Sequence, residues 1–283
     1  MTELALQTIN VNGVDIAYLE RGEGPLVLCL HGFPDSAYSF EGMLETLAEA
    51  GYRAVAPFLR GYYPSGLAPD GDYSVPAVAA DILGLVDLLG VGRASIVGHD
   101  WGGFTAYAAA NIAPEKIQRL VVMAVPHMHV TAMSWAQLKK SWYVFFFQLP
   151  WLPERVVARD NFAFIDRLYQ VWSPNWDPKH FQLTPVKRAL AIAGGLKAAL
   201  GYYRAMIRGS KNQHRAIMES QTSVPALWIA GTADGSVGIE QFSGIEAAFT
   251  GPFELIRVEG AGHFVHREAR QQVENKIVDF FSA

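Results

Sequence analysis

Val97-Gly98-His99-Asp100-Trp101-Gly102-Gly103 decides the fold of this chain, because it joins a strand pattern to a helix pattern through a tight turn. The residues before it, 94–97, are apolar and partly β-branched, as in a buried strand, whereas the alanine-rich 104–112 predicts a helix. The glycines suit a turn in which larger side chains would collide. Asp100, at the tip, is expected to have a strained backbone conformation.

This arrangement has the form of a nucleophile elbow, which presents the residue at its tip to a substrate. Hydrolases more often have serine there, and a carboxylate attacks carbon centres that serine attacks poorly. The alternative is an ordinary strand-to-helix turn, since the helix dipole also favours an acidic residue at a helix N-terminus. The rest of the chain must decide whether Asp100 is a nucleophile.

Three further strand patterns each end in a loop that carries functional groups. They are 26–30 before His31-Gly32-Phe33-Pro34-Asp35, 226–230 before Gly231-Thr232-Ala233-Asp234-Gly235, and 255–258 before Glu259-Gly260-Ala261-Gly262-His263-Phe264. The carboxyl ends of parallel strands meet at one edge of a sheet. Asp100, Asp234 and His263 are therefore expected together there, in the chain order nucleophile, acid, histidine that is typical of α/β hydrolases.

Five motifs follow one another in an order that is specific to one family. They are His31-Gly32-Phe33-Pro34, Arg60-Gly61-Tyr62, Gly98-His99-Asp100-Trp101-Gly102-Gly103, Gly231-Thr232-Ala233-Asp234-Gly235 and Gly260-Ala261-Gly262-His263-Phe264. In these motifs, over nearly its whole length, the chain resembles the α/β-hydrolase epoxide hydrolases, relatives of the haloalkane dehalogenases. The resemblance implies a mostly parallel sheet flanked by helices, an inserted helical cap and a cis Phe33–Pro34 bond.

The resemblance also implies a reaction in two steps and a role for each site residue. Asp100 attacks an epoxide carbon and forms an ester. His263, oriented by Asp234, then activates the water that hydrolyses the ester. The amides of Phe33 and Trp101 form the oxyanion hole. The expected product is a vicinal diol, and neither a cofactor nor a metal is expected.

Opening an epoxide leaves an alkoxide, which needs a hydrogen-bond donor as the C–O bond breaks. Tyr143 and Tyr203 resemble the cap tyrosines that meet this need in the family. Both are therefore expected to bind the substrate, together with Phe33 and Trp101. The alternative is that each hydroxyl only satisfies a buried polar group. Tyr202 would point at least a quarter-turn away on a helix and is expected to pack.

The alternation of strand and helix patterns predicts the domain organisation. Asn12-Gly13 predicts a hairpin between 8–11 and 14–19. Strands are expected near 26–30, 52–57, 94–98, 118–124, 225–230 and 253–258, and helices near 40–50, 76–89, 102–112 and 268–281. Strand patterns disappear between about 128 and 218. We therefore expect a core formed by residues 1–128 and 219–283, and a helical cap formed by 129–218.

The expected cap differs from the core in composition. It contains five of the seven tryptophans: Trp135, Trp142, Trp151, Trp172 and Trp176. Residues 129–218 carry 13 Lys and Arg and 4 Asp and Glu, a net charge of +9, whereas the rest of the chain carries −13. One interpretation of this difference is that the opposite charges attract the cap to the core. The other is that the charges only lie on solvated helix faces, where salt screens them. Most cap aromatics are expected to pack, and some to line an apolar pocket.

The remaining composition narrows the class of protein. A chain of 283 residues that is 51% hydrophobic can bury a large core, and a net charge of −4 argues against nucleic-acid binding. Cys29 is the single cysteine and lies inside an apolar run. The chain starts without a basic region and contains no span of about 18 apolar residues, so a cytoplasmic enzyme with no membrane partner is expected. Monomer and homodimer both stay open.

Other polar residues score lower as site candidates. His31 and His99 flank the key loops and are expected to bond backbone groups, since no metal-ligand spacing surrounds them. His127, His129 and His266 lie outside any motif and are expected at the surface or a boundary. Asp35 is expected to be a loop or helix-cap residue and no member of the triad.

Two other functions compete with epoxide hydrolysis. A haloalkane dehalogenase would use the same Asp100 nucleophile, and the Trp101 indole resembles a halide donor, but many dehalogenases have asparagine where this chain has Phe33. A hydrolase-like binding protein is the more remote alternative. It would be expected to lack a triad member, and none is missing here. A small apolar epoxide is therefore the expected substrate.

Overall fold

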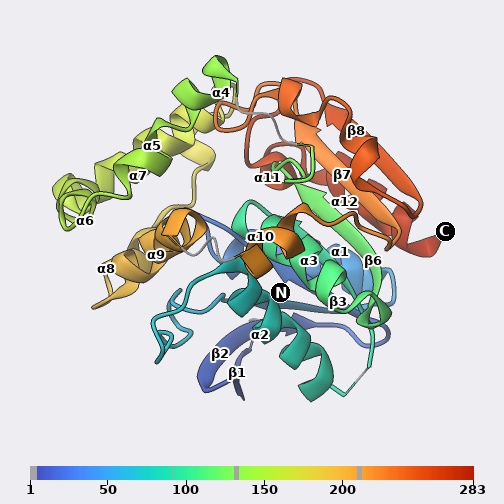
Figure 1. Ribbon diagram of the computed structural model, residues 1–283. Helices are drawn as coiled ribbons and strands as arrows, with labels where there is room; N and C mark the ends of the chain where they lie inside the picture. The colour runs from blue at the N-terminus through green and yellow to red at the C-terminus, as the bar shows by residue number, and fades with distance from the viewer. Residues whose placement is uncertain (1–4, 91, 131–133, 209–211) are drawn as a thin grey trace.

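The computed structural model describes residues 5–90, 92–130, 134–208 and 212–283. The start of the chain, on which the expected location partly rests, lies outside these ranges. Eight strands form one sheet in the order β1-β2-β4-β3-β5-β6-β7-β8 (Figure 1). Their bounds are β1 Leu6–Val11, β2 Val14–Arg21, β3 Leu26–Leu30, β4 Arg53–Pro57, β5 Ala94–His99, β6 Ile117–Met123, β7 Ala226–Gly231 and β8 Phe253–Val258.

The sheet is mostly parallel, as predicted. The pairs β1–β2 and β2–β4 are antiparallel, whereas all pairs from β4–β3 to β7–β8 are parallel. Asn12 and Gly13 form the predicted hairpin turn, with φ of 52° and 80°, the positive values that a type I′ turn requires. The Phe33–Pro34 bond is cis, as the resemblance implied.

Helices cover both faces of the sheet and give the core two apolar layers (Figure 1). α1 (Glu41–Glu49), α11 (Val265–Glu268) and α12 (Arg270–Ser282) lie on one face, and α2 (Val75–Leu88) and α3 (Trp101–Ile112) on the other. In β3 the side chains alternate between the layers: Leu26, Leu28 and Leu30 face α2 and α3, while Val27 and Cys29 face α1 and α12. Because β3 is buried on both faces, all five of its residues, Leu26–Leu30, are apolar.

Between β6 and β7, the regular elements that the structure describes are helices joined by turns and loops. This α4–α10 segment contains α4 (Trp135–Lys140), α5 (Trp142–Phe146), α6 (Leu152–Val157), α7 (Arg159–Trp172), α8 (Thr184–Ala191), α9 (Gly195–Arg208) and α10 (Asn212–Glu219). Helices α4 to α7 form an arm that stands off the sheet, and α10 packs on α3 (Figure 1). Within the described ranges, no helix is long and apolar enough to cross a lipid bilayer.

Short 3-10 helices occupy several connections: η1 (Ala37–Phe40), η2 (Pro114–Lys116), η3 (Pro178–His180), η4 (Ile239–Phe242) and η5 (Ile245–Ala248). The predicted C-terminal helix differs from the observed one at its start. Ala269 leaves the helical conformation, with φ −119° and ψ 43°, so α11 ends at Glu268 and α12 begins at Arg270.

Candidate active site

The turn between β5 and α3 holds Asp100 in an unusual backbone conformation. Its φ of 51° and ψ of −119° are rare for a residue other than glycine. The turn stays closed because a Cβ at Gly98 would collide with the Gly102 carbonyl, and one at Gly102 with the Leu30 carbonyl. The Asp100 amide donates to the Met123 carbonyl at 3.2 Å, which ties the elbow to β6. The observed geometry is that of a nucleophile elbow.

His263 and Asp234 meet at the carboxyl ends of β8 and β7. His263 Nδ1 donates to Asp234 Oδ2 at 2.9 Å, and both residues are buried. The other carboxylate oxygen of Asp234 accepts hydrogen bonds from the amides of Ser236, at 2.7 Å, and Val237, at 2.9 Å. The acid is therefore fixed by its own loop, and it fixes the tautomer of the imidazole, which leaves Nε2 to face Asp100.

The carboxylate of Asp100 lies between the imidazole and the loop after β3. Its Oδ2 is 3.6 Å from His263 Nε2, and its Oδ1 accepts a hydrogen bond of 2.8 Å from the Phe33 amide. The Trp101 amide lies beside the same carboxylate. Asp100 Oδ1 and Trp101 N both approach Gly32 so closely that a Cβ there would collide with each of them. The structure thus brings together the five residues expected to form the triad and the oxyanion hole.

Two opposing effects set the protonation of His263. Burial by itself lowers the pKa of the imidazole, but the charges of Asp234 and Asp100, and the hydrogen bonds to them, raise it to about 10. The two carboxylates therefore favour the protonated form of the ring. The ring can accept a proton only after one of those charges has been removed.

Tyr143 and Tyr203, from α5 and α9, face each other above this centre. Their ring centroids are 5.8 Å apart, and the Tyr203 ring packs edge-on against Trp101 with centroids 4.9 Å apart. Burial, and then the charge of Asp100, raise the pKa of the Tyr203 hydroxyl well above its usual value. Both phenols are thus buried, protonated and close enough to Asp100 for its charge to affect them.

The two hydroxyls differ in their partners. The Tyr143 hydroxyl forms a 3.0 Å hydrogen bond with Ser236 Oγ. The Tyr203 hydroxyl is buried and has no hydrogen-bond partner, and the same holds for Trp101 Nε1. A buried donor without a partner calls for an explanation. Both of these donors lie near Asp100, where a bound substrate would accept hydrogen bonds from them. Tyr202 points away, as expected, and its hydroxyl donates to the Arg60 carbonyl at 2.9 Å.

Sequence reasoning missed the contacts that join α4 to the loop carrying Asp234. Gln137 Nε2 donates to the Ser236 carbonyl at 2.8 Å, and the Gly238 amide donates to Gln137 Oε1 at 2.9 Å. Lys140 Nζ donates to the Asp234 carbonyl at 2.8 Å. Ser236 could have been found, since it stands two residues after the acid. Nothing in the sequence marks Gln137 or Lys140.

The expectation for the two histidines of the key loops is confirmed. His31 Nε2 accepts a 3.1 Å hydrogen bond from the Leu59 amide, and His99 Nε2 donates to the His263 carbonyl at 2.9 Å. Burial, and then the neighbouring His263, lower the pKa of His99 to about 3, so its ring is neutral. His99 therefore acts as a fixed support beneath the candidate base.

The expectation that His127 and His266 lie at the surface or a boundary is wrong. Both are buried: His127 stacks on Tyr107 with ring centroids 4.5 Å apart, and His266 stacks on Phe40 at 5.0 Å. Each ring packs against residues far away in the chain, and such contacts leave no periodic signal in the sequence, which explains the error. His129 is exposed, as expected.

Asp35 lies in a loop, as expected, but it does not cap a helix. The residue at the N-cap of η1 is Ser36, whose amide donates to Asp35 Oδ1 at 2.8 Å. Asp35 Oδ2 is buried, 3.8 Å from His266 Nε2, and ligand-type atoms of Asp35, His99 and His266 lie within 4.8 Å of one another. Tetrahedral zinc ligands are closer, at about 3.4 Å from each other. We assign no metal to this cluster.

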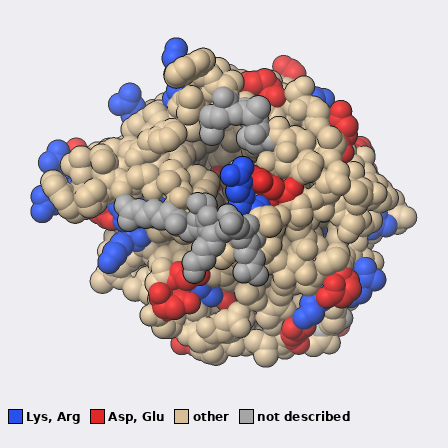
Figure 2. Space-filling model, in the orientation of Figure 1, with Lys and Arg blue, Asp and Glu red and all other residues tan. Residues whose placement is uncertain are grey.

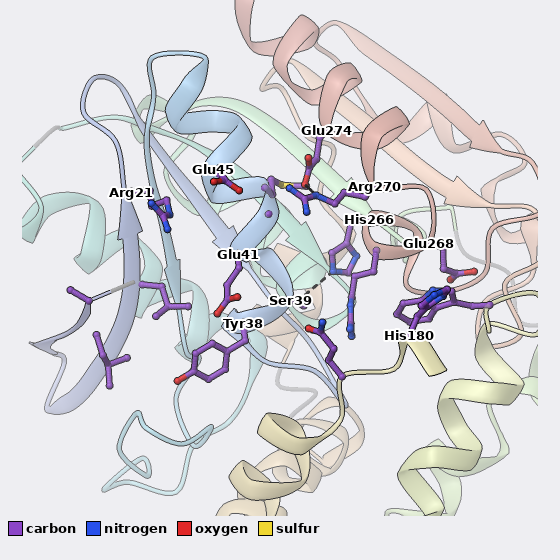
Figure 3. Close-up of a pocket in the computed structure, with 18 residues that line it drawn as sticks. Arg21, Tyr38, Ser39, Glu41, Glu45, His180, His266, Glu268, Arg270 and Glu274 are labelled. Atoms are coloured by element: carbon purple, nitrogen blue, oxygen red, sulfur yellow. Dashed lines mark hydrogen bonds and ion pairs between the residues drawn. The ribbon is translucent and has the colours of Figure 1, made fainter. Parts of the chain in front are cut away.

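Two cavities border the region. Figure 3 shows one of about 1320 Å³ beside His266, whose walls carry charges of both signs, including Arg21, Glu41, Glu45 and Arg270. This wall suits an apolar substrate poorly. The other, of about 320 Å³, is lined by Trp101 together with the apolar side chains of Phe104, Met128, Met206 and Met218. An apolar hollow therefore lies against the residue that follows Asp100.

Comparisons with known proteins agree with this geometry. Residues 25–269 match the α/β hydrolase fold family. The chain is 31% identical to AB hydrolase superfamily protein YfhM of Bacillus subtilis, over 99% of both chains. It is 30% identical to Epoxide hydrolase 1 of Caenorhabditis elegans, over 97% of this chain and 69% of that protein. The crystal structure of epoxide hydrolase VrEH1 from Vigna radiata is similar with a TM-score of 0.85 and 28% identity, covering 99% of this chain and 98% of that one.

Proposed function

Because this chain belongs to the α/β hydrolases and, among them, to the epoxide hydrolases, we propose that it converts a small apolar epoxide to a vicinal diol through an ester of Asp100. One observation carries the proposal. A carboxylate stands at the elbow, 3.6 Å from an imidazole that a second carboxylate orients, below a buried phenol without a hydrogen-bond partner. That combination suits attack on carbon with protonation of a leaving oxygen.

In the first step an Asp100 oxygen attacks one epoxide carbon as the C–O bond of the ring breaks. Tyr203 and Tyr143 hold the departing oxygen by hydrogen bonds, and one of them gives it a proton, so that it becomes the hydroxyl of a hydroxyalkyl ester. The tyrosinate then regains a proton from the imidazolium of His263, which leaves the imidazole neutral. Tyr203 has no competing partner, so its hydroxyl is available at once. Tyr143 can donate to the substrate while Ser236 donates to Tyr143, because the hydroxyl of serine rotates freely.

In the second step a water attacks the ester carbonyl. Formation of the ester removes the negative charge of Asp100, which is one of the causes of the raised pKa of His263. The imidazolium therefore becomes more acidic once the ester exists, and its neutral form can take a proton from the attacking water. The amides of Phe33 and Trp101 stabilise the oxyanion. As it collapses and the ester C–O bond breaks, the imidazolium protonates the leaving oxygen to give the diol, and the carboxyl proton of Asp100 returns to His263.

Dehalogenation is the second candidate, and one observation favours it. Trp101 Nε1 is buried next to the nucleophile and has no hydrogen-bond partner, so it could receive a halide. A halide leaves without protonation, whereas an alkoxide does not. The two phenols over the site would then have no task in the chemistry, which is why we favour the epoxide.

A parallel assay separates the two candidates. Diol and halide release are measured over one panel of aryl, alicyclic and alkyl epoxides and the corresponding haloalkanes, with the parent protein and Asp100→Ala. We expect diol release from the parent alone. Halide release that exceeds diol release over the whole panel would replace the proposal with a dehalogenase. Activity in Asp100→Ala equal to that of the parent would remove the covalent mechanism.

The remaining parts of the proposal concern the surroundings of the site. We propose that residues 129–218, which contain α4 to α9 and α10 up to its last residue but one, serve as a cap over Asp100, supported by the origin of both tyrosines in this segment. The reaction as written needs neither a cofactor nor a metal. A cytoplasmic location stays a prediction.

A further inference from the structure

The outer side of the α4–α10 segment exposes large apolar side chains. We call the following group the aromatic face: Trp135, Trp142, Phe145, Leu149, Trp151 and Leu152. Trp135 is 83% exposed and Trp151 61%. Soluble proteins scatter single apolar residues over the surface, whereas these six gather on or beside three consecutive helices, α4 to α6, as at a surface that meets another apolar phase.

The packing of its own helices covers only part of the aromatic face. The opposite side of α5 is already buried, through Tyr143 and Phe147, and α6 is anchored through Val157. The exposed residues of α5 and the following turn, Trp142, Phe145 and Leu149, recur at the spacing that places them along one side of a helix. α5 packs against α7, through Phe164 and Trp172, and against Tyr203 of α9, yet Trp142 and Phe145 stay half exposed, at 50% and 53%.

Basic side chains surround the aromatic face. Lys139, Arg155 and Arg159 are exposed on α4, α6 and the start of α7. In Figure 2, Lys and Arg stand along the outer edge of this arm with uncharged surface between them. The guanidinium of Arg155 also lies over the Trp151 ring, 4.8 Å from its centroid. Positive charge therefore lies next to the exposed aromatic rings.

Asp160, exposed beside Arg159, offsets part of this charge, whereas two other acids of the segment are paired within it. Glu154 binds Arg204 of α9, and Asp166 binds Lys187 of α8 at 2.8 Å. Both acids are thus neutralised from within the segment. Residues 129–218 keep a net charge of +9, and two copies that met face to face would bring equal charges together.

We propose that the aromatic face docks on the surface of a lipid bilayer rich in anionic lipids. Tryptophan is enriched at the headgroup level of membranes, where its ring is partly apolar and partly polar. Lys and Arg next to it add attraction to anionic lipids, at about 1 kcal/mol for each group near the surface. The expectation of no membrane partner rests on the lack of a long apolar run in the sequence, but binding in the plane of the interface needs no such run.

Docking on a bilayer would serve the proposed reaction, but the evidence for docking does not depend on that reaction. An apolar epoxide partitions into lipid, and a cap on the bilayer surface would receive it there. The evidence for docking is the surface alone, so binding is tested without any turnover. Failure of the docking proposal leaves the proposed reaction untouched, and the reverse also holds.

The test is co-sedimentation with vesicles of phosphatidylcholine alone and with vesicles containing 30% phosphatidylserine. We expect binding to the anionic vesicles at low salt and its loss at 0.5 M salt, since screening shortens the range of charges. Trp135→Ser and Lys139→Glu should each lower partitioning several-fold, and both together by at least about tenfold. Trp135 is so exposed that its replacement leaves the core intact.

The matched control is Leu88→Ser with Ile112→Ser, two exposed apolar residues on α2 and α3 of the core. It should bind vesicles like the parent. Absence of binding to anionic vesicles by the parent overturns the proposal. Equal loss in the control and in Trp135→Ser also overturns it. Analytical ultracentrifugation tests the rival explanation. If the parent forms a dimer that Trp135→Ser dissociates, and does not bind vesicles, the aromatic face binds a second copy of the chain and not lipid.

Discussion

The hydroxyl of Tyr143 and Ser236 Oγ lie 3.0 Å apart, and this contact joins the α4–α10 segment to the loop of the triad. The Ser236 amide in turn donates to Asp234 Oδ1 at 2.7 Å. One phenol is therefore connected to the acid that orients His263, whereas the other, Tyr203, has no hydrogen-bond partner. The two tyrosines are inequivalent before a substrate binds.

Ser236→Ala should weaken Tyr143 as a donor without removing it. A hydrogen bond donated to the phenol oxygen stabilises the charge that develops there, and a typical bond contributes about 0.5–1.5 kcal/mol. We expect the rate of ester formation in a stopped-flow single turnover to fall by about 2-fold to 10-fold. Ser236→Thr keeps the hydroxyl and should restore most of the rate. An unchanged rate in Ser236→Ala would show that the contact is only structural.

Tyr143→Phe and Tyr203→Phe should each slow ester formation with epoxides on the order of 10²-fold, the scale of a positioned acid. The double variant should lose more than either single one. Tyr202→Phe is the matched control, because its hydroxyl bonds the Arg60 carbonyl away from Asp100. Circular dichroism and thermal melting check the fold of each variant. If the folded double variant opens epoxides at the parent rate, the phenols are structural.

His263→Gln should stall the second step and spare the first, because the base acts on water and not on the epoxide. The ester then accumulates. Intact-mass spectrometry after addition of substrate should show one adduct with the mass of the epoxide, on a peptide that contains Asp100. Steady turnover with no adduct would remove His263 from the mechanism.

The raised pKa of His263 also predicts a dependence of stability on pH. The pKa of the folded protein, about 10, lies above the unfolded value of about 6.5. The imidazolium therefore contributes stability that is fully present below pH 6.5 and is lost as pH rises toward 10. Urea denaturation should give a free energy of unfolding that falls over this range more steeply in the parent than in His263→Gln. Parallel curves would contradict the raised pKa.

The elements that position the site could be predicted because their signals are local. The buried runs that end before His31, Asp100 and Asp234 have the length and composition of parallel strands, and the turn at Asn12-Gly13 allows little else. Because these strands are parallel, the loops that follow them lie at the same edge of the sheet. The sequence could therefore indicate which residues meet, because the sheet topology brings them together however far apart they lie along the chain.

The connections across the site could not be predicted, because they join residues far apart in the chain without a repeating pattern. Gln137 binds the loop at Gly238, 101 residues later, through an amide that any glutamine carries. His266 was misplaced for a related reason. Its ring is buried against Phe40, 226 residues earlier, and only the packed structure shows that neighbour.

The most direct test of the account is the origin of the oxygen in the diol. With enzyme in excess over epoxide in ¹⁸O-water, a single turnover should give mostly unlabelled diol, because the transferred oxygen comes from the carboxylate of Asp100. Label should enter the diol only in later turnovers, after water has exchanged an oxygen of that carboxylate. Fully labelled diol from the first turnover would mean that water attacks the epoxide directly, and it would contradict the covalent ester.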